Sequence, residues 1–314
     1  MSESWREQMY VGLVHFMAFP NATEKEPLLD SVRYLAKDDF WDVIEVKRSE
    51  EPGVHQALKE LAEQAGMKIG VGAQPWLLTQ KLSLNDPDEA GRKAAIDEVK
   101  KSIDAAYEMD ARIVAVLTGK DPGPAERDHQ LDLLVDSLTQ LCKYSQEKAQ
   151  DYVAWISVET FDYDVDKACL LGPTDRAADC ISRVKAAGVS NIGLTIDLSH
   201  LPMLREDYAE CLSLAAEHLI HVHVGNCVCA DPALPGYGDL HPRFEYPGGE
   251  NGVNELRLFL EALTYVGYFR SEVPTPKPIV TFEVKPMPGE DSEIVLAQTK
   301  RIFRRAWAAM GTQQ

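Results

Sequence analysis

Four short apolar runs in the second half of the chain each end in a side chain that can bind a metal ion. The runs are AWISVETF, GLTIDLSH, LIHVHVGN and IVTFEVKP, and the side chains at or near their ends are Glu159, Asp197, His223 and Glu283. Each run has the composition of a buried strand, and a stretch of helical periodicity separates it from the next. Parallel strands joined by helices bring their carboxyl ends to one rim, so we expect these four side chains to meet there.

Charge repulsion makes such a cluster informative. Three carboxylates and one imidazole that meet on a rim repel one another unless a cation neutralises them. A single carboxylate at a strand end is often only a helix N-cap or an acceptor for loop N–H groups. Because Glu159, Asp197, His223 and Glu283 end four successive strands, the sequence predicts a divalent-metal site formed by all four.

The rest of the chain alternates between strand and helix patterns in the same way. The expected strands are 10–19, 41–47, 67–74, 111–118, 153–159, 192–197, 219–224 and 279–284. The expected helices are 23–37, 52–65, 86–108, 125–149, 174–187, 206–217, 253–266 and 291–309. Eight strand–helix units are the number that a (β/α)₈ TIM barrel requires. Gly66, Gly188 and Gly267 follow helical patterns, where a left-handed C-cap favours glycine.

The domain organisation follows from this count. No linker rich in Gly, Ser and Pro divides the 314 residues, so we expect one α/β domain over 1–314. The longest irregular stretch, 225–252, follows the seventh expected strand. A structureless loop of this length is usually functional or disordered, and we expect it to overhang the metal site.

Composition excludes several classes of protein. The net charge is -18, from 50 acidic and 32 basic residues, with no basic stripe of the kind that binds nucleic acid. No apolar run approaches the roughly 20 residues that span a bilayer, and the polar start MSESWREQMY shows no secretory signal. The six cysteines lack the spacing of zinc or redox motifs. We therefore expect a cytoplasmic protein that binds neither nucleic acid nor membranes.

Several motifs carry a family resemblance. They are SVETF with Glu159, the DxxH of Asp197 to His200, the HxH of His221 to His223, the FExKP-like end of the last strand (282–286), and the Gly-rich turn and helix over 247–269. The chain resembles the xylose-isomerase-like TIM-barrel superfamily, which includes sugar epimerases, inositol-catabolic dehydratases and isomerases, and apurinic endonucleases. The resemblance implies the same four metal ligands and a substrate-binding role for His200.

The expected chemistry follows from the ligand set. An oxygen-rich set suits Mn²⁺, Mg²⁺ or Co²⁺, and we expect Mn²⁺. A carbonyl and a hydroxyl on adjacent carbons could fill the two remaining positions, and the metal would stabilise the enediolate formed on proton loss. By family analogy, Glu159 and Glu283 flank the substrate, and one removes the proton that the other returns. His200 could bond a substrate hydroxyl or orient a ligand.

Five further residues near the expected rim are candidates for contacting a substrate: His15, Glu45, Trp76, His241 and Lys285. Each has a plainer alternative. His15 could be a satisfied core histidine of the first strand, and Glu45 could pair with a neighbouring lysine. Trp76 is expected as an apolar wall against a sugar face. His241 could be an acid or base or a solvated loop residue, and Lys285 could stabilise an oxyanion or form a salt bridge.

These expectations favour a metal-dependent isomerase or epimerase of a sugar or related polyhydroxy ketone. The alternative is a lyase that uses the same enolate for β-elimination, either a dehydratase or the α subunit of a C-deglycosylation enzyme. Where the epimerase branch has an arginine soon after the seventh strand, this chain has Gly225 to Val228, and its first arginine is Arg243. We expect a carbohydrate substrate, and either a homo-oligomer or, for a lyase, a smaller partner subunit.

The nuclease and the non-catalytic binding module are disfavoured. The endonuclease branch uses several more histidines for a trinuclear zinc site and needs a cationic surface for DNA, whereas this chain has eight histidines in total and a net charge of -18. A binding module would leave metal ligands at the loop rim of a barrel without a role, although that rim is where barrel enzymes act.

Overall fold

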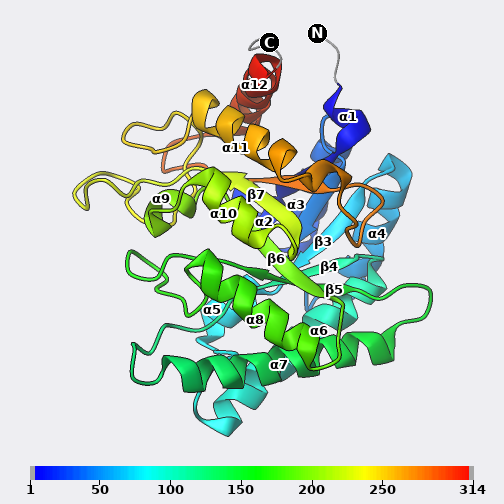
Figure 1. Cartoon of the computed structure of the whole chain (residues 1–314). Helices are drawn as coiled ribbons and strands as arrows, with labels where there is room; N and C mark the ends of the chain where they lie inside the picture. The colour runs from blue at the N-terminus through cyan, green and yellow to red at the C-terminus, as the bar shows by residue number, and fades with distance from the viewer. Residues whose placement is uncertain (1–3, 311–314) are drawn as a thin grey trace.

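Eight parallel strands close into a barrel in the order β1 to β8 (Figure 1). The computed structural model describes residues 4–310. The strands are β1 Tyr10–Val14, β2 Val43–Val46, β3 Lys68–Gly72, β4 Ile113–Val116, β5 Trp155–Glu159, β6 Ile192–Asp197, β7 Leu219–Gly225 and β8 Ile279–Glu283. The predicted (β/α)₈ TIM barrel is therefore confirmed.

Helices connect the strands and cover the outside of the barrel (Figure 1). They are α1 Trp5–Gln8, α2 His15–Ala18, α3 Lys25–Ala36, α4 Val54–Ala65, α5 Gln74–Gln80, α6 Glu89–Glu108, α7 Arg127–Lys148, α8 Thr174–Ala186, α9 Leu201–Leu204, α10 Tyr208–Ala215, α11 Val253–Tyr265, the 3₁₀ turn η1 Tyr268–Arg270 and α12 Ser292–Met310. Within residues 4–310, no helix combines the length and apolarity needed to cross a membrane.

The strands are apolar on both faces because helices cover them outside and side chains fill them inside. All six residues of β6 and all seven of β7 are buried. The α1 and α12 helices lie together at the top of Figure 1, where Trp5 packs edge-on against Phe303 with 5.2 Å between ring centroids. This aromatic contact joins the two ends of the described chain.

Strand register decides which side chains share the barrel interior. Asp197 of β6 pairs with His223 of β7, and Gly225 of β7 pairs with Glu283 of β8. Because alternate residues point inward, the ligand-bearing positions lie above an inner layer that includes Ser157 and Thr195, whose hydroxyl oxygens are 2.6 Å apart. The candidate metal-ligating side chains therefore point into the carboxyl end of the barrel.

The loop after β5 is folded around one carboxylate. Asp162 is fully buried and accepts the backbone N–H groups of Val165, Asp166, Lys167 and Ala168, at 2.6 to 3.3 Å. Four bonds from one loop to one side chain replace the secondary structure that this segment lacks. Asp162 thereby fixes the position of Lys167 near the barrel mouth.

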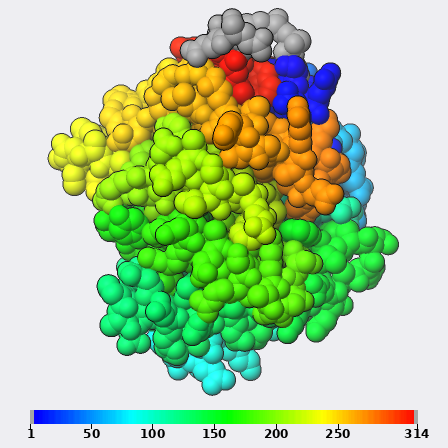
Figure 2. All heavy atoms as spheres, viewed as in Figure 1, coloured from blue at the N-terminus to red at the C-terminus, as the bar shows by residue number. Residues whose placement is uncertain are grey.

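The long loop after β7 contains no helix or strand, as expected for the irregular stretch 225–252, but it is held in place by hydrogen bonds. Its two ends are joined, because the Asn226 side-chain oxygen accepts the N–H of Asn251 at 2.7 Å. Asn251 in turn donates to the carbonyls of Leu198 and Gly225. Part of the loop (yellow) projects at the left of Figures 1 and 2. Its His241 is nevertheless buried at 2% exposure, so this loop forms part of the interior.

One local expectation was wrong, and two short helices were missed. The first strand ends at Val14, and His15 begins the short helix α2 instead of continuing the strand to 19. The short helix α9 was missed, although Pro202 in its first turn is a helix signal. The helix expected over 206–217 is confirmed as α10, which the Asp207 carboxylate caps by accepting two backbone N–H groups. The helix α5 was missed, although Pro75 at its start is a recognised helix signal.

The role of Asp162 can be tested by unfolding. Asp162→Ala removes the buried acceptor of four loop N–H groups, so we expect the free energy of unfolding to fall by about 3 kcal/mol in urea titrations followed by circular dichroism. Asp164→Ala is the matched control, since Asp164 is exposed and pairs only with the exposed Arg205, and we expect a change below about 0.5 kcal/mol. Equal losses in the two variants would contradict the organising role of Asp162.

Candidate active site

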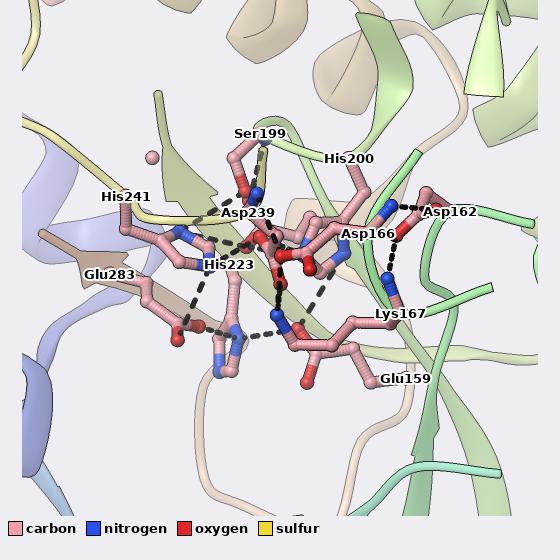
Figure 3. Close-up of polar contacts among 12 residues, drawn as sticks. Glu159, Asp162, Asp166, Lys167, Ser199, His200, His223, Asp239, His241 and Glu283 are labelled. Atoms are coloured by element: carbon pink, nitrogen blue, oxygen red, sulfur yellow. Dashed lines mark hydrogen bonds and ion pairs between the residues drawn. The ribbon is translucent and has the colours of Figure 1, made fainter. Parts of the chain in front are cut away.

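Four side chains converge at the carboxyl end of the barrel. Ligand atoms of Glu159, Asp197, His223 and Glu283 all lie within 4.8 Å of one another. The His223 Nδ1 atom is 3.1 Å from Glu159 Oε1 and 3.0 Å from Glu283 Oε2 (Figure 3). The structure therefore brings together the four residues that the sequence suggested as metal ligands; their occupation by a metal remains a prediction.

Two observations show that these residues fit a cation. The Asp197 Oδ2 atom is buried and has no hydrogen-bond partner among the described residues, while Oδ1 accepts the N–H of Ser199 at 2.7 Å. The His223 ring faces carboxylates with both nitrogens, although a neutral imidazole has only one N–H to donate. A divalent cation bound by these atoms would satisfy both requirements.

The pKa of His223 reflects the same imbalance. Burial alone would lower it, but the carboxylates of Glu45 and Glu159 raise the pKa well above its usual value. The carboxylates therefore favour a positive charge at the centre of the cluster, and a proton supplies that charge when no metal is bound.

Glu45 contacts His223 of this cluster, and also His221, from within the barrel. Its Oε1 lies 2.7 Å from His221 Nε2, and its Oε2 lies 3.1 Å from His223 Nε2. Burial would raise the pKa of Glu45, but the two imidazoles lower it well below the usual value. The Glu45 side chain fits because residue 70 is a glycine: a Cβ atom there would lie 2.9 Å from Glu45 Cγ. Glu45 thus pairs with histidines inside the barrel, and neither of the roles suggested from sequence describes this contact.

A second group of buried ligands lies beside the first. Ligand atoms of Asp197, His200 and His241 are also within 4.8 Å of one another. His200 donates from Nδ1 to the carbonyl of Thr160 at 2.6 Å, which directs its Nε2 toward Asp239 Oδ1 at 3.1 Å. The same Asp239 oxygen is 2.8 Å from His241 Nε2 (Figure 3).

The surroundings of this second group also favour positive charge on its histidines. Burial would lower the pKa values of His200 and His241, but acidic neighbours raise them to about 10 and about 9. Asp239 and Asp197 act on His200, and Glu283 and Asp239 act on His241. Since Asp197 belongs to both groups, the two could hold a pair of cations that share its carboxylate.

Three residues of the site were not predicted from the sequence. Asp239 joins the two histidines, Gln74 donates from Nε2 to Glu159 Oε2 at 2.8 Å, and Lys167 lies 3.3 Å from Asp239 Oδ2. Asp239 and His241 have the same one-residue spacing as the HxH of β7, and that spacing was an available signal. Gln74 ends the strand expected over 67–74, and that rim position was also an available signal. No sequence signal links Lys167 to the site, because the packing of its loop positions it.

The remaining candidates lie elsewhere in the mouth region. His15 is buried, its Nε2 is 2.8 Å from Ser31 Oγ, and burial lowers its pKa to about 4, with a smaller contribution from Lys47. Its assignment to the first strand was wrong, and this bond matches the plainer alternative of a satisfied core histidine. Trp76 stacks under the Arg48 guanidinium at 3.8 Å, and both residues line a pocket with His15.

Lys285 does not share a strand face with Glu283. The β8 strand ends at Glu283, so strand alternation no longer applies two residues later. The contact that the structure shows is a backbone one, from the N–H of Lys285 to the carbonyl of His241 at 2.7 Å. This bond fastens the loop after β7 to the end of β8.

Fold and site together define an α/β barrel with buried metal-type ligands at the carboxyl ends of its strands. The chain belongs to the xylose isomerase-like TIM barrel family, whose model matches residues 32–297. An uncharacterized protein of Methanocaldococcus jannaschii is 25% identical over 269 residues, which cover 84% of this chain and 82% of that protein.

Solved structures share the fold over nearly the whole chain. A D-tagatose 3-epimerase-like protein is 20% identical with a TM-score of 0.71, covering 96% of this chain and 98% of its own. The 3-keto-D-glucoside 4-epimerase of E. coli is 14% identical with a TM-score of 0.67, covering 94% and 99%. The IolI protein with a bound zinc atom is 16% identical with a TM-score of 0.67, covering 97% and 100%.

Metal binding can be measured directly. Protein freed of metal with a chelator and titrated calorimetrically with Mn²⁺ should bind two ions per chain, because two ligand groups converge on Asp197. Asp197→Asn should weaken both sites. His241→Ala should leave one site, because His241 belongs only to the second group. Absence of any binding to the wild-type protein would contradict the metal assignment, and one ion in both wild type and His241→Ala would contradict the second site.

The role of Glu45 can be tested separately from the ligands themselves. Glu45→Gln removes the charge that orients His223, and we expect Mn²⁺ affinity to fall roughly 10- to 100-fold, as is typical when a partner of a ligating histidine is lost. Glu50→Gln is the control, since Glu50 is exposed and pairs with Arg48. Wild-type affinity in Glu45→Gln would show that Glu45 does not position His223.

Proposed function

We propose that this protein is a metal-dependent isomerase or epimerase that moves a proton beside the carbonyl of a sugar or related polyhydroxy ketone. The observation that carries the proposal is the placement of Glu159 and Glu283 against one atom, His223 Nδ1, at 3.1 and 3.0 Å. Two carboxylates that face each other across a polar centre can remove a proton from one side of a carbon and return it on the other.

A divalent cation held by Glu159, Asp197, His223 and Glu283 would polarise a bound carbonyl and thereby acidify the adjacent C–H bond. The protein's own groups carry the proton. Gln74 donates to Glu159 Oε2 and so fixes the orientation of that carboxylate. Glu283 is the more accessible of the pair, with side-chain exposures of 12% against 2%. It therefore faces the opening through which a substrate enters.

The imidazoles of His200 and His241 border the same space. Asp239 holds both rings, and Lys167 holds the second oxygen of Asp239. Rings fixed in this way can bind substrate hydroxyls or ligate a second cation, because little conformational entropy remains to be lost on binding. The nitrogen content of this second group suits ions such as Mn²⁺, Co²⁺ or Zn²⁺ better than Mg²⁺.

The comparisons support the same reaction class. Proteins of this fold carry the names D-tagatose 3-epimerase-like protein and 3-keto-D-glucoside 4-epimerase, and the IolI structure holds a zinc atom. Each of these names concerns a carbohydrate reaction or a bound metal, and we extend both features to this chain as part of the proposal.

A lyase that acts by β-elimination is the second candidate, and one observation favours it. Arg243, the first arginine after β7, bonds Glu290 through Nε at 2.8 Å. It is therefore engaged in an ion pair instead of serving the substrate contact that the epimerase branch makes after its seventh strand. The enolate chemistry would be the same, with a leaving group on the neighbouring carbon, and a smaller partner subunit belongs to this alternative.

Isotope exchange tests the proton transfer. Incubation of Mn²⁺-loaded protein in heavy water with ketoses and 3-keto glycosides should place deuterium beside the carbonyl. Glu159→Gln and Glu283→Gln should each slow exchange by about 10²- to 10⁴-fold, the usual contribution of a general base. Glu272→Gln, which changes an exposed carboxylate, should exchange normally.

Metal content must be measured in the same samples, since both glutamates are also candidate ligands. Exchange at the normal rate in either glutamine variant would remove that residue from the proton transfer. Release of an aglycone from a 3-keto glycoside, without return of the epimer, would select the lyase.

A further inference from the structure

A pocket of about 500 Å³ lies beside the metal-type ligands and has a different chemistry from theirs. It is formed by α5 and by the loops after β3, β4 and β5, which places it on the carboxyl side of the barrel. Its lining combines the apolar side chains of Leu77, Leu78, Leu82 and Leu117 with three lysines, Lys81, Lys120 and Lys167. Its volume falls within the range of small-molecule sites.

The pocket is connected to the site at two points. Lys167 lines the pocket and is 3.3 Å from Asp239, the carboxylate that joins His200 and His241 (Figure 3). On the other side, Leu77 lies one helical turn after Gln74, whose amide bonds Glu159. The residues that line the pocket are therefore direct neighbours of the residues that hold the metal-type ligands.

The walls of the pocket are fixed by hydrogen bonds. The N–H of Gly119 donates to Asn85 Oδ1 at 2.7 Å, and the N–H of Leu170 donates to the carbonyl of Gly119 at 2.8 Å. These bonds join the loops after β3, β4 and β5, and Asp162 holds the last of them from inside. A pocket with fixed walls is prepared for a ligand before it arrives.

The charges in the pocket select the ligand. Asp166, the acidic residue of the lining, is already used, because its Oδ2 accepts from Lys167 and from the N–H of Asp239. Across residues 4–310, no ion pair involves Lys81 or Lys120. Positive charge without a protein partner, in a chain of net charge -18, favours a negatively charged ligand.

The leucines exclude a bare sugar or a free inorganic anion as the natural occupant. A sugar needs many hydrogen-bond partners, which leucines do not offer, and a small inorganic anion gains nothing from an apolar wall. An apolar group placed against the four leucines would be removed from water, which favours its binding. We propose that this pocket binds an apolar group that carries a negative charge, such as an aryl group with a carboxylate or an ionised phenol. Resting on the proposed function, this makes the substrate a polyhydroxy ketone linked to such a group.

Three probes separate the two requirements of the pocket. Naphthalenesulfonate has the apolar body and the charge, and its sulfonate is a poor metal ligand. Naphthylmethanol has the body without the charge, and methanesulfonate has the charge without the body. In calorimetric titrations of the Mn²⁺-loaded protein, naphthalenesulfonate should bind about tenfold more tightly than naphthylmethanol, methanesulfonate should show no measurable binding, and the affinity for naphthalenesulfonate should fall as salt is added.

Variants locate the binding. Lys81→Met and Lys120→Met keep the apolar stem and lose the charge, so each should weaken naphthalenesulfonate binding about two- to fivefold. Leu78→Asp, at a position that is 42% exposed and so tolerates the change, should weaken it at least tenfold. Lys143→Met, on the exposed side of α7, should bind like wild type.

Each outcome decides between alternatives. Equal affinity for naphthylmethanol and naphthalenesulfonate, or unchanged affinity in the lysine and Leu78 variants, would overturn the proposal. Deuterium exchange on free ketoses and on 3-keto glycosides is measured in parallel on the same protein. Exchange without probe binding contradicts only the pocket, and probe binding without exchange on any of these compounds contradicts only the proposed reaction.

Discussion

The balance of buried charge at the barrel mouth is the constraint on which the site depends. Five carboxylates and four imidazoles are packed there with almost no exposure to water: Glu45, Glu159, Asp197, Asp239, Glu283, His200, His221, His223 and His241. Buried carboxylates without compensation are costly. Each one here faces an imidazole, a lysine, an amide or a backbone N–H, except for the orphaned Asp197 oxygen. A cation at that oxygen would complete the balance, and folding and metal binding would then be coupled through the same groups.

Strand-borne features of this arrangement could be predicted from sequence. The register of parallel strands and the alternation of side chains are local rules, and they are sufficient to predict that Glu159, Asp197, His223 and Glu283 share one rim. The same rules predict the barrel and its eight units. Errors gathered where a strand ends, as at Val14, because the residue that follows is positioned by a tertiary contact such as His15 with Ser31.

Loop-borne features could not be predicted in this way. His241 could be named as a candidate from its place in the long loop, but its burial beside Asp239 could not, because Asn226 and Asn251 join the ends of that loop through contacts between residues far apart in sequence. Gln74 and Lys167 reach the site through the packing of α5 and of the loop around Asp162. For Glu45, the sequence showed a strand-end carboxylate but not the two histidines across the barrel that bind it.

The space that Gly70 leaves for the Glu45 side chain has a wider consequence. A methyl group at position 70 would push against the Glu45 stem, and the displacement would pass through His223 to the whole ligand cluster. A substitution that appears conservative, in a strand without a candidate ligand, would thus disturb the candidate ligands on the opposite side of the barrel.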